Sequence, residues 1–157
     1  MAFATFFFLT WIAFAILFLM KNKLSFLEYT FIYLVVLIVN INFSWIIGEE
    51  FKWIKSTKEP IVFVALLFHR ILLLPLIILI SINLMKGFNR TLLKFIVAGG
   101  FIFFLVVTSG LVVHMHLVTY ENWTYLYDCL YFVSLLFIAN GSYRLIHPAR
   151  QGEVKSV

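Results

Sequence analysis

Arg70 stands in the middle of an apolar stretch, residues 60–85, beside His69 and five residues before Pro75. The stretch is long enough to cross a membrane as a helix. At about 1.5 Å per helical residue, Arg70 would lie about 15 Å inside it. An arginine keeps its proton, so in hydrocarbon its guanidinium needs an acid, water or the membrane interface. A charged residue at such a depth marks a functional site by default, which makes Arg70 the first candidate.

Other polar residues recur at comparable depth in the neighbouring apolar stretches. Asn40 belongs to the second stretch, Thr108 to the fourth and Asp128 to the fifth. Each would be costly in hydrocarbon unless it is buried with the others or hydrated. We therefore predict an outward-facing polar pocket for a substrate or an ion, formed by Arg70, Asp128, His69, Asn40 and Thr108.

Asp128 is the natural partner of Arg70, because an arginine side chain extends about 6 Å and could reach a carboxylate on a neighbouring helix. Three interpretations stay open. The pair could gate or bind a charged substrate, or it could only fix the packing of the helices. Alternatively, Arg70 could extend to lipid phosphates without Asp128.

Pro75 interrupts the hydrogen-bond ladder of the same helix. It has no backbone N–H, so it frees the carbonyl of Ile71, one residue after Arg70. Broken helices mark the binding sites of some transporters, but membrane helices also tolerate ordinary proline kinks. We expect the ordinary kink here.

His114, His116 and Glu121 are the candidate metal ligands. Two histidines at i and i+2 point about 200° apart on a regular helix, so they can share a metal only where the helix unwinds. Asp128 could add an oxygen ligand and Met115 a soft one. The simpler interpretation places both histidines at the interface, bonded to loop groups or headgroups. The four histidines do not match in depth as a haem site requires, and no cofactor is expected.

Two features predict which side chains face the interior of the protein. Ala98, Gly99 and Gly100 let helices approach closely, so the fourth helix should be the most buried. Trp11, near the middle of the first stretch, should face protein, where its indole N–H can find an acceptor.

The elements that would hold these residues are apolar helices. The chain has 157 residues, of which 64% are hydrophobic and 12% charged, whereas soluble domains carry about 25% charged residues. Each of five segments approaches the roughly 20 residues that a membrane-spanning helix needs. We predict an all-α, polytopic bundle of five transmembrane helices in a single domain, 1–157. The helices should cover residues 2–20, 24–47, 60–85, 92–118 and 123–146, followed by a short cytoplasmic tail, 147–157.

Basic residues are distributed unequally between the two ends of this bundle. Because positively charged loops stay inside, the excess predicts an N-terminus outside and a C-terminus in the cytoplasm of a cell-membrane protein. The residues on the inner side are Lys21, Lys23, Lys86, Arg90, Lys94, Arg144, Arg150 and Lys155, and those on the outer side are Lys52, Lys55 and Lys58.

Three further segments lie at the predicted interfaces. The second loop, from Gly48 to Pro60, should form an interfacial turn, with docking of a partner as the alternative. Glu28 should be structural, because a carboxylate near a helix N-terminus complements the helix dipole. The tail should touch anionic lipids at its basic start and then fray.

Three classes of function remain open. The first is an accessory, regulatory or assembly subunit that acts through helix contacts, which suits the short loops. The second is a small transporter or channel with a pocket around Arg70 and Asp128. The third is a membrane-embedded enzyme for a lipid-type substrate, using His114, His116, Glu121 or Asp128. The expected partners are the lipid bilayer and either a membrane protein or a second copy. Nucleic acid is not expected, because loop lysines explain the net charge of +5.

Overall fold

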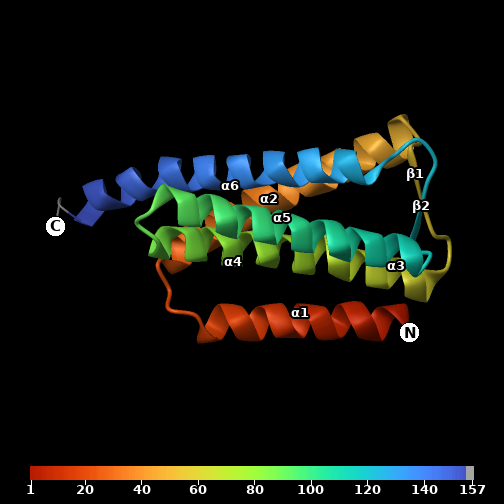
Figure 1. Ribbon diagram of the computed structural model, residues 1–157, viewed down its shortest axis with the longest axis horizontal. Helices are drawn as coiled ribbons and strands as arrows, with labels where there is room; N and C mark the ends of the chain where they lie inside the picture. Colours follow the sequence, from red (N-terminus) through yellow and green to blue (C-terminus); the bar gives the residue numbers. More distant parts are fainter. Residues whose placement is uncertain (155–157) are drawn as a thin grey trace.

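The computed structural model describes the backbone of residues 1–154 and the side chains of residues 1–147. Helices dominate the described part of the chain, and two short strands complete it (Figure 1). The α-helices are α1 (Ala2–Leu19), α2 (Phe26–Trp45), α3 (Pro60–Leu67), α4 (Leu74–Gly87), α5 (Thr91–His114) and α6 (Tyr125–Val154). Two short π-helical segments are η1 (Ile46–Glu50) and η2 (Phe68–Leu73). The strands are β1 (Ile54–Ser56) and β2 (Val118–Tyr120).

Five helical spans in the described residues are long and apolar enough to cross a membrane, which suggests a multi-pass membrane protein. The second span joins α2 to η1, and the third joins α3, η2 and α4. Successive spans run antiparallel along one axis, so the two ends of the chain lie at opposite ends of the bundle (Figure 1). The prediction of five apolar helices is confirmed, with bounds that shift by a few residues.

The third span is the centre of the bundle. Every residue from Leu74 to Asn83 is buried, because α4 packs against α1, α2, α5 and α6. The prediction that the fourth helix is the most buried is wrong. A Cβ placed on Gly99 or Gly100 of α5 would meet no atom of a neighbouring element within 4 Å in the described part of the chain, so these glycines do not serve packing among the described residues.

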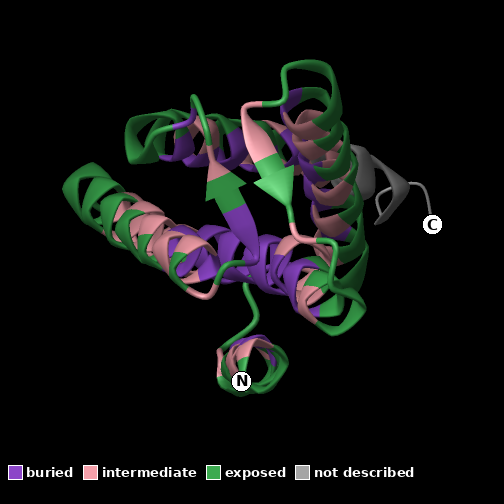
Figure 2. Ribbon diagram, turned by 90° about the vertical axis from the view of Figure 1, so that its right-hand side faces the viewer, coloured by how far each residue is buried: buried purple, intermediate pink, exposed green. Residues whose placement is uncertain are grey.

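Helix α1 lies at the edge of the bundle, as the end-on view makes clear (Figure 2). It contacts the third span through Phe6, Thr10 and Ala13, which recur every three or four residues on one face. Trp11 lies off this face and is 67% exposed. The prediction that Trp11 faces protein is therefore wrong.

A small antiparallel sheet crosses the end of the bundle and joins its second and fourth loops (Figure 2). Ile54 pairs with Tyr120 and Ser56 with Val118. Helix α5 ends at His114 rather than at residue 118, because His116 turns the chain with a φ of 57° before β2 begins. The second loop is thus a paired strand with turns, and not only the interfacial turn that the sequence predicts.

The last helix is longer than expected. Helix α6 continues to Val154, so most of the predicted tail is helical rather than frayed. Residues 155–157 lie outside the described residues, as do the side chains from residue 148 onward, which include Arg150 and Lys155.

Candidate functional site

The π-turn η2, together with Pro75, leaves two backbone carbonyls of the third span without hydrogen-bond donors from their own helix. At its C-terminal end, the N–H of Leu74 donates to the carbonyl of His69, five residues back. Leu74 is therefore unavailable to the Arg70 carbonyl, and Pro75, the next residue, has no N–H to offer. The Ile71 carbonyl loses its α-helical donor for the same reason. Two consecutive carbonyls beside Arg70 consequently need partners from outside their own helix.

Helix α2 supplies both partners. The Asn40 side-chain N–H donates to the Arg70 carbonyl at 2.6 Å, and the Tyr33 hydroxyl donates to the Ile71 carbonyl at 3.0 Å. The prediction that Pro75 frees the Ile71 carbonyl is confirmed, since a side chain has taken that acceptor. Asn40 also accepts a 2.6 Å hydrogen bond from the Tyr131 hydroxyl of α6. One buried amide thereby connects three of the five spans.

Asp128 is bound by donors close to it rather than by Arg70. It is buried in the first turn of α6. One carboxylate oxygen accepts hydrogen bonds from the Ser109 hydroxyl at 2.9 Å and the Tyr120 hydroxyl at 2.8 Å, and the other accepts one from the Trp123 indole N–H at 2.8 Å. Three donors satisfy a buried carboxylate without a cation. The predicted ion pair between Asp128 and Arg70 is not formed.

Tyr120 stays a hydrogen-bond donor in this cluster. Burial raises the pKa of its hydroxyl above the ordinary value, and the negative charge of Asp128 raises it further. The Tyr120 hydroxyl therefore stays protonated and can donate its hydrogen bond to the Asp128 carboxylate.

His69 and Thr108 form a second buried contact in the same layer. The Thr108 hydroxyl donates to the Leu105 carbonyl at 2.8 Å, so the His69 Nε2, 3.4 Å from that hydroxyl, is the donor of their contact. The ring of His69 also packs edge-on against Phe6 of α1, with 5.4 Å between ring centroids.

The residues predicted for the polar pocket lie close together. A cavity of about 60 Å³ is lined by Asn40, His69, Arg70 and Asp128, and Thr108 is bonded to one of these residues. Tyr33 and Tyr131, which were not among the residues predicted for this pocket, complete the layer. Tyr131 follows Asp128 by three residues, so the same face of one helix carries both, and that spacing was a usable signal.

A second, larger pocket of about 700 Å³ lies between α2 and the α3–η2 segment, under the loop that carries β1. Arg70 lines both cavities and lies at the inner end of the larger one, three turns into its helix. The charged residues of its lining are Lys52, Lys55, Lys58, Arg70 and Glu49.

Most of these cations are not neutralised by the protein. Lys55 pairs with Glu121 at the surface. The guanidinium of Arg70 has no hydrogen-bond or ion-pair partner within the described part of the chain, and neither do the ammonium groups of Lys52 and Lys58. The pocket therefore presents an excess of positive charge at two levels, in the loop and at its inner end.

The predicted metal ligands do not assemble. No three His, Cys, Asp or Glu side chains in the described residues lie close enough to hold a metal ion. Glu121 is engaged by Lys55, while His114 and His116 are exposed at the end of α5. Helix α5 does end there, but Glu121 follows β2 and its carboxylate pairs with Lys55 of β1 instead of with the histidines.

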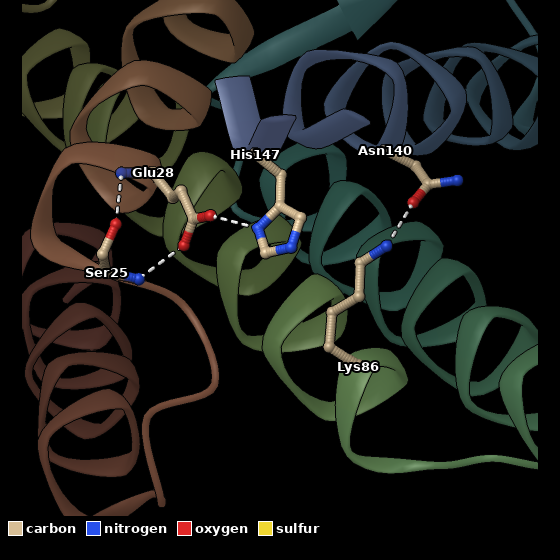
Figure 3. A network of polar contacts seen from close by, with 5 residues as sticks. All are labelled: Ser25, Glu28, Lys86, Asn140 and His147. Carbon is tan, nitrogen blue, oxygen red and sulfur yellow. Dashed lines mark hydrogen bonds and ion pairs between the residues drawn. The ribbon is translucent and has the colours of Figure 1, made fainter. Parts of the chain in front are cut away.

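The opposite end of the bundle carries a separate polar cluster (Figure 3). Glu28 forms a reciprocal capping box with Ser25 at the start of α2, and it also pairs with His147 of α6 at 2.8 Å. Nearby, Lys86 donates to Asn140 at 3.1 Å. These contacts fasten α2, α4 and α6 together, consistent with the structural role expected for Glu28.

No protein-family model matches the chain, and no curated protein or solved structure shows significant similarity to it.

Proposed function

We propose that this protein is a multi-pass subunit of the cell membrane that binds an anionic group in the larger pocket, which we term the Arg70 pocket. One observation carries the proposal: the guanidinium of Arg70 lines a cavity of about 700 Å³ and has no acidic partner among the described residues. A charge held at such depth without a counter-ion is costly, and an anionic ligand removes that cost.

An accessory, regulatory or assembly role is better supported than transport. A conduit needs a path through both halves of the bundle. Beyond the polar layer, the interior is filled by the unbroken buried run from Leu74 to Asn83. The pocket and the adjacent π-turn favour the transporter alternative, which would need α4 to move relative to its neighbours.

The enzyme alternative has less support. It depends on acids and histidines acting together. Asp128 is instead occupied by three hydrogen-bond donors, and Glu121 by Lys55.

The proposed orientation places the N-terminus outside and the C-terminus in the cytoplasm. The support is the excess of lysine and arginine at the end of the bundle that carries the C-terminus. A reporter active only outside the membrane should be silent when it is fused after Val157 and active when it is inserted near Lys55. The opposite pattern would invert the orientation.

Anion binding can be tested on the purified full-length chain in detergent. We expect sodium phosphate to raise the unfolding temperature of the wild type relative to sodium chloride at equal ionic strength, because a ligand that binds only the folded state stabilises it. Arg70→Gln should lose this effect. Arg90→Gln, an exposed arginine at the other end, should retain it. Equal stabilisation of all three proteins would refute specific binding at Arg70.

A further inference from the structure

We infer that the anionic group is the phosphate of an anionic phospholipid, which enters the Arg70 pocket sideways from the membrane between α2 and α3. This inference rests on the proposed anion-binding function and specifies its ligand. Three independent features of the pocket support it: its depth, the chemistry of its walls and the arrangement of its charges.

The depth of Arg70 lets its side chain extend toward the level of the lipid headgroups. The third span, Pro60–Gly87, has 28 residues, which corresponds to a helix of about 42 Å. A bilayer with its headgroups is about 40–45 Å thick, around a hydrocarbon core of about 30 Å. Arg70 follows Pro60 by ten residues, so its Cα would lie about 15 Å from the outer surface and about 8–9 Å below the hydrocarbon boundary. An arginine side chain extending about 6 Å brings the guanidinium close to that boundary.

The walls of the pocket are amphipathic in the way a lipid requires. On α2, Ile41 is 49% exposed and Trp45 is 57% exposed; on α3, Phe63 is 42% exposed. These side chains lie beside Asn40 and Ser44, which also line the cavity. Acyl chains could therefore remain against apolar side chains while the headgroup occupies the polar interior. A small water-soluble anion would make no use of the apolar walls.

The charges of the lining are mostly positive and lie at two levels of the pocket. Arg70 lies at the inner end, and Lys52 and Lys58 lie in the loop above it, with Glu49 as the single carboxylate of the lining. A guanidinium binds phosphate oxygens through paired N–H donors, and lysines bind phosphate as point charges. The same cations would repel the choline group of a zwitterionic lipid. The pocket should therefore prefer headgroups that carry no cation of their own.

The test measures lipid binding to the full-length protein by native mass spectrometry from detergent. The probes are phosphatidylglycerol, phosphatidylcholine and the soluble headgroup analogue glycerol 1-phosphate. We expect phosphatidylglycerol to bind the wild type at least about tenfold more tightly than phosphatidylcholine. Arg70→Gln should weaken phosphatidylglycerol binding by about tenfold or more, the scale of one lost charge-assisted contact. Arg90→Gln is the matched control and should bind like the wild type.

A second variant covers the case in which Arg70→Gln does not fold. Lys52→Gln combined with Lys58→Gln changes only exposed loop side chains, and it should also reduce the preference for phosphatidylglycerol. If the two lipids bind the wild type equally, the inference is overturned. If glycerol 1-phosphate binds with dependence on Arg70 while the lipid does not, the lipid ligand is wrong and the anion-binding function stands. If neither probe depends on Arg70 or on the loop lysines, both proposals fail.

Discussion

The side-chain amide of Asn40 donates a 2.6 Å hydrogen bond to the carbonyl of Arg70, an acceptor that its own helix cannot use. The N–H of Leu74 donates to the backbone carbonyl of His69, and Pro75 has no N–H. Asn40 therefore does more than fill a gap between helices. It holds the backbone of the π-turn in place and so sets the position from which the Arg70 side chain projects.

Replacing Asn40 with leucine should lower the free energy of unfolding in detergent by about 2–6 kcal/mol. The change leaves the Arg70 carbonyl and the Tyr131 hydroxyl buried without partners, at about 1–3 kcal/mol each. Asn42→Leu on the same helix is the control, because Asn42 is exposed and bonds only the Ile38 carbonyl of its own helix. Comparable losses in the two variants would show that the contact to Arg70 contributes nothing.

Pro75→Ala should make Tyr33 dispensable. Tyr33→Phe alone removes the donor to the Ile71 carbonyl and should cost about 1 kcal/mol. An alanine at position 75 restores a backbone N–H that can reach this carbonyl, so Tyr33→Phe should cost less in the Pro75→Ala background. A double-mutant cycle measures the difference. Strict additivity would mean that Pro75 is not the reason for the contact.

Asp128 should be energetically coupled to Trp123 more strongly than to Arg70. The indole N–H donates directly to the Asp128 carboxylate at 2.8 Å, and hydrogen bonds to charged groups contribute about 1.5–3 kcal/mol. Two double-mutant cycles test this, one with Asp128→Asn and Trp123→Phe and the other with Asp128→Asn and Arg70→Gln. A larger coupling energy in the second cycle would support the direct ion pair between Asp128 and Arg70 that the sequence predicts.

Tyr120 should make stability depend on pH only in the alkaline range. Because the pKa of Tyr120 is raised in the folded protein by burial and by Asp128, its contribution is fully present below the unfolded-state pKa of about 10. The contribution is lost as the pH rises above that value toward the folded-state pKa. Tyr120→Phe should flatten this part of the stability profile in detergent. An unchanged alkaline profile in the variant would contradict the assignment to Tyr120.

Several features of this protein follow from the sequence alone because they are local properties of the chain. Hydropathy predicts the five spans, and the missing N–H of Pro75 predicts the free carbonyl at Ile71. The depth of a residue along its helix predicts that Arg70, Asn40 and Asp128 share one layer. Each of these conclusions needs only the rise per residue and the chemistry of one side chain.

The tertiary structure decided which groups within that layer meet. The spans are apolar around most of their circumference, so no polar stripe in the sequence reveals which face of each helix turns inward. The third span therefore became the buried centre in place of the glycine-containing fourth. Asp128 accepts hydrogen bonds from three neutral donors, and one of them, Tyr120, lies on the strand β2 in what the sequence predicts only as the fourth loop. Arg70 lines a pocket but forms no ion pair within the described residues, because the rotation of packed helices, and not their depth, determines which side chains meet.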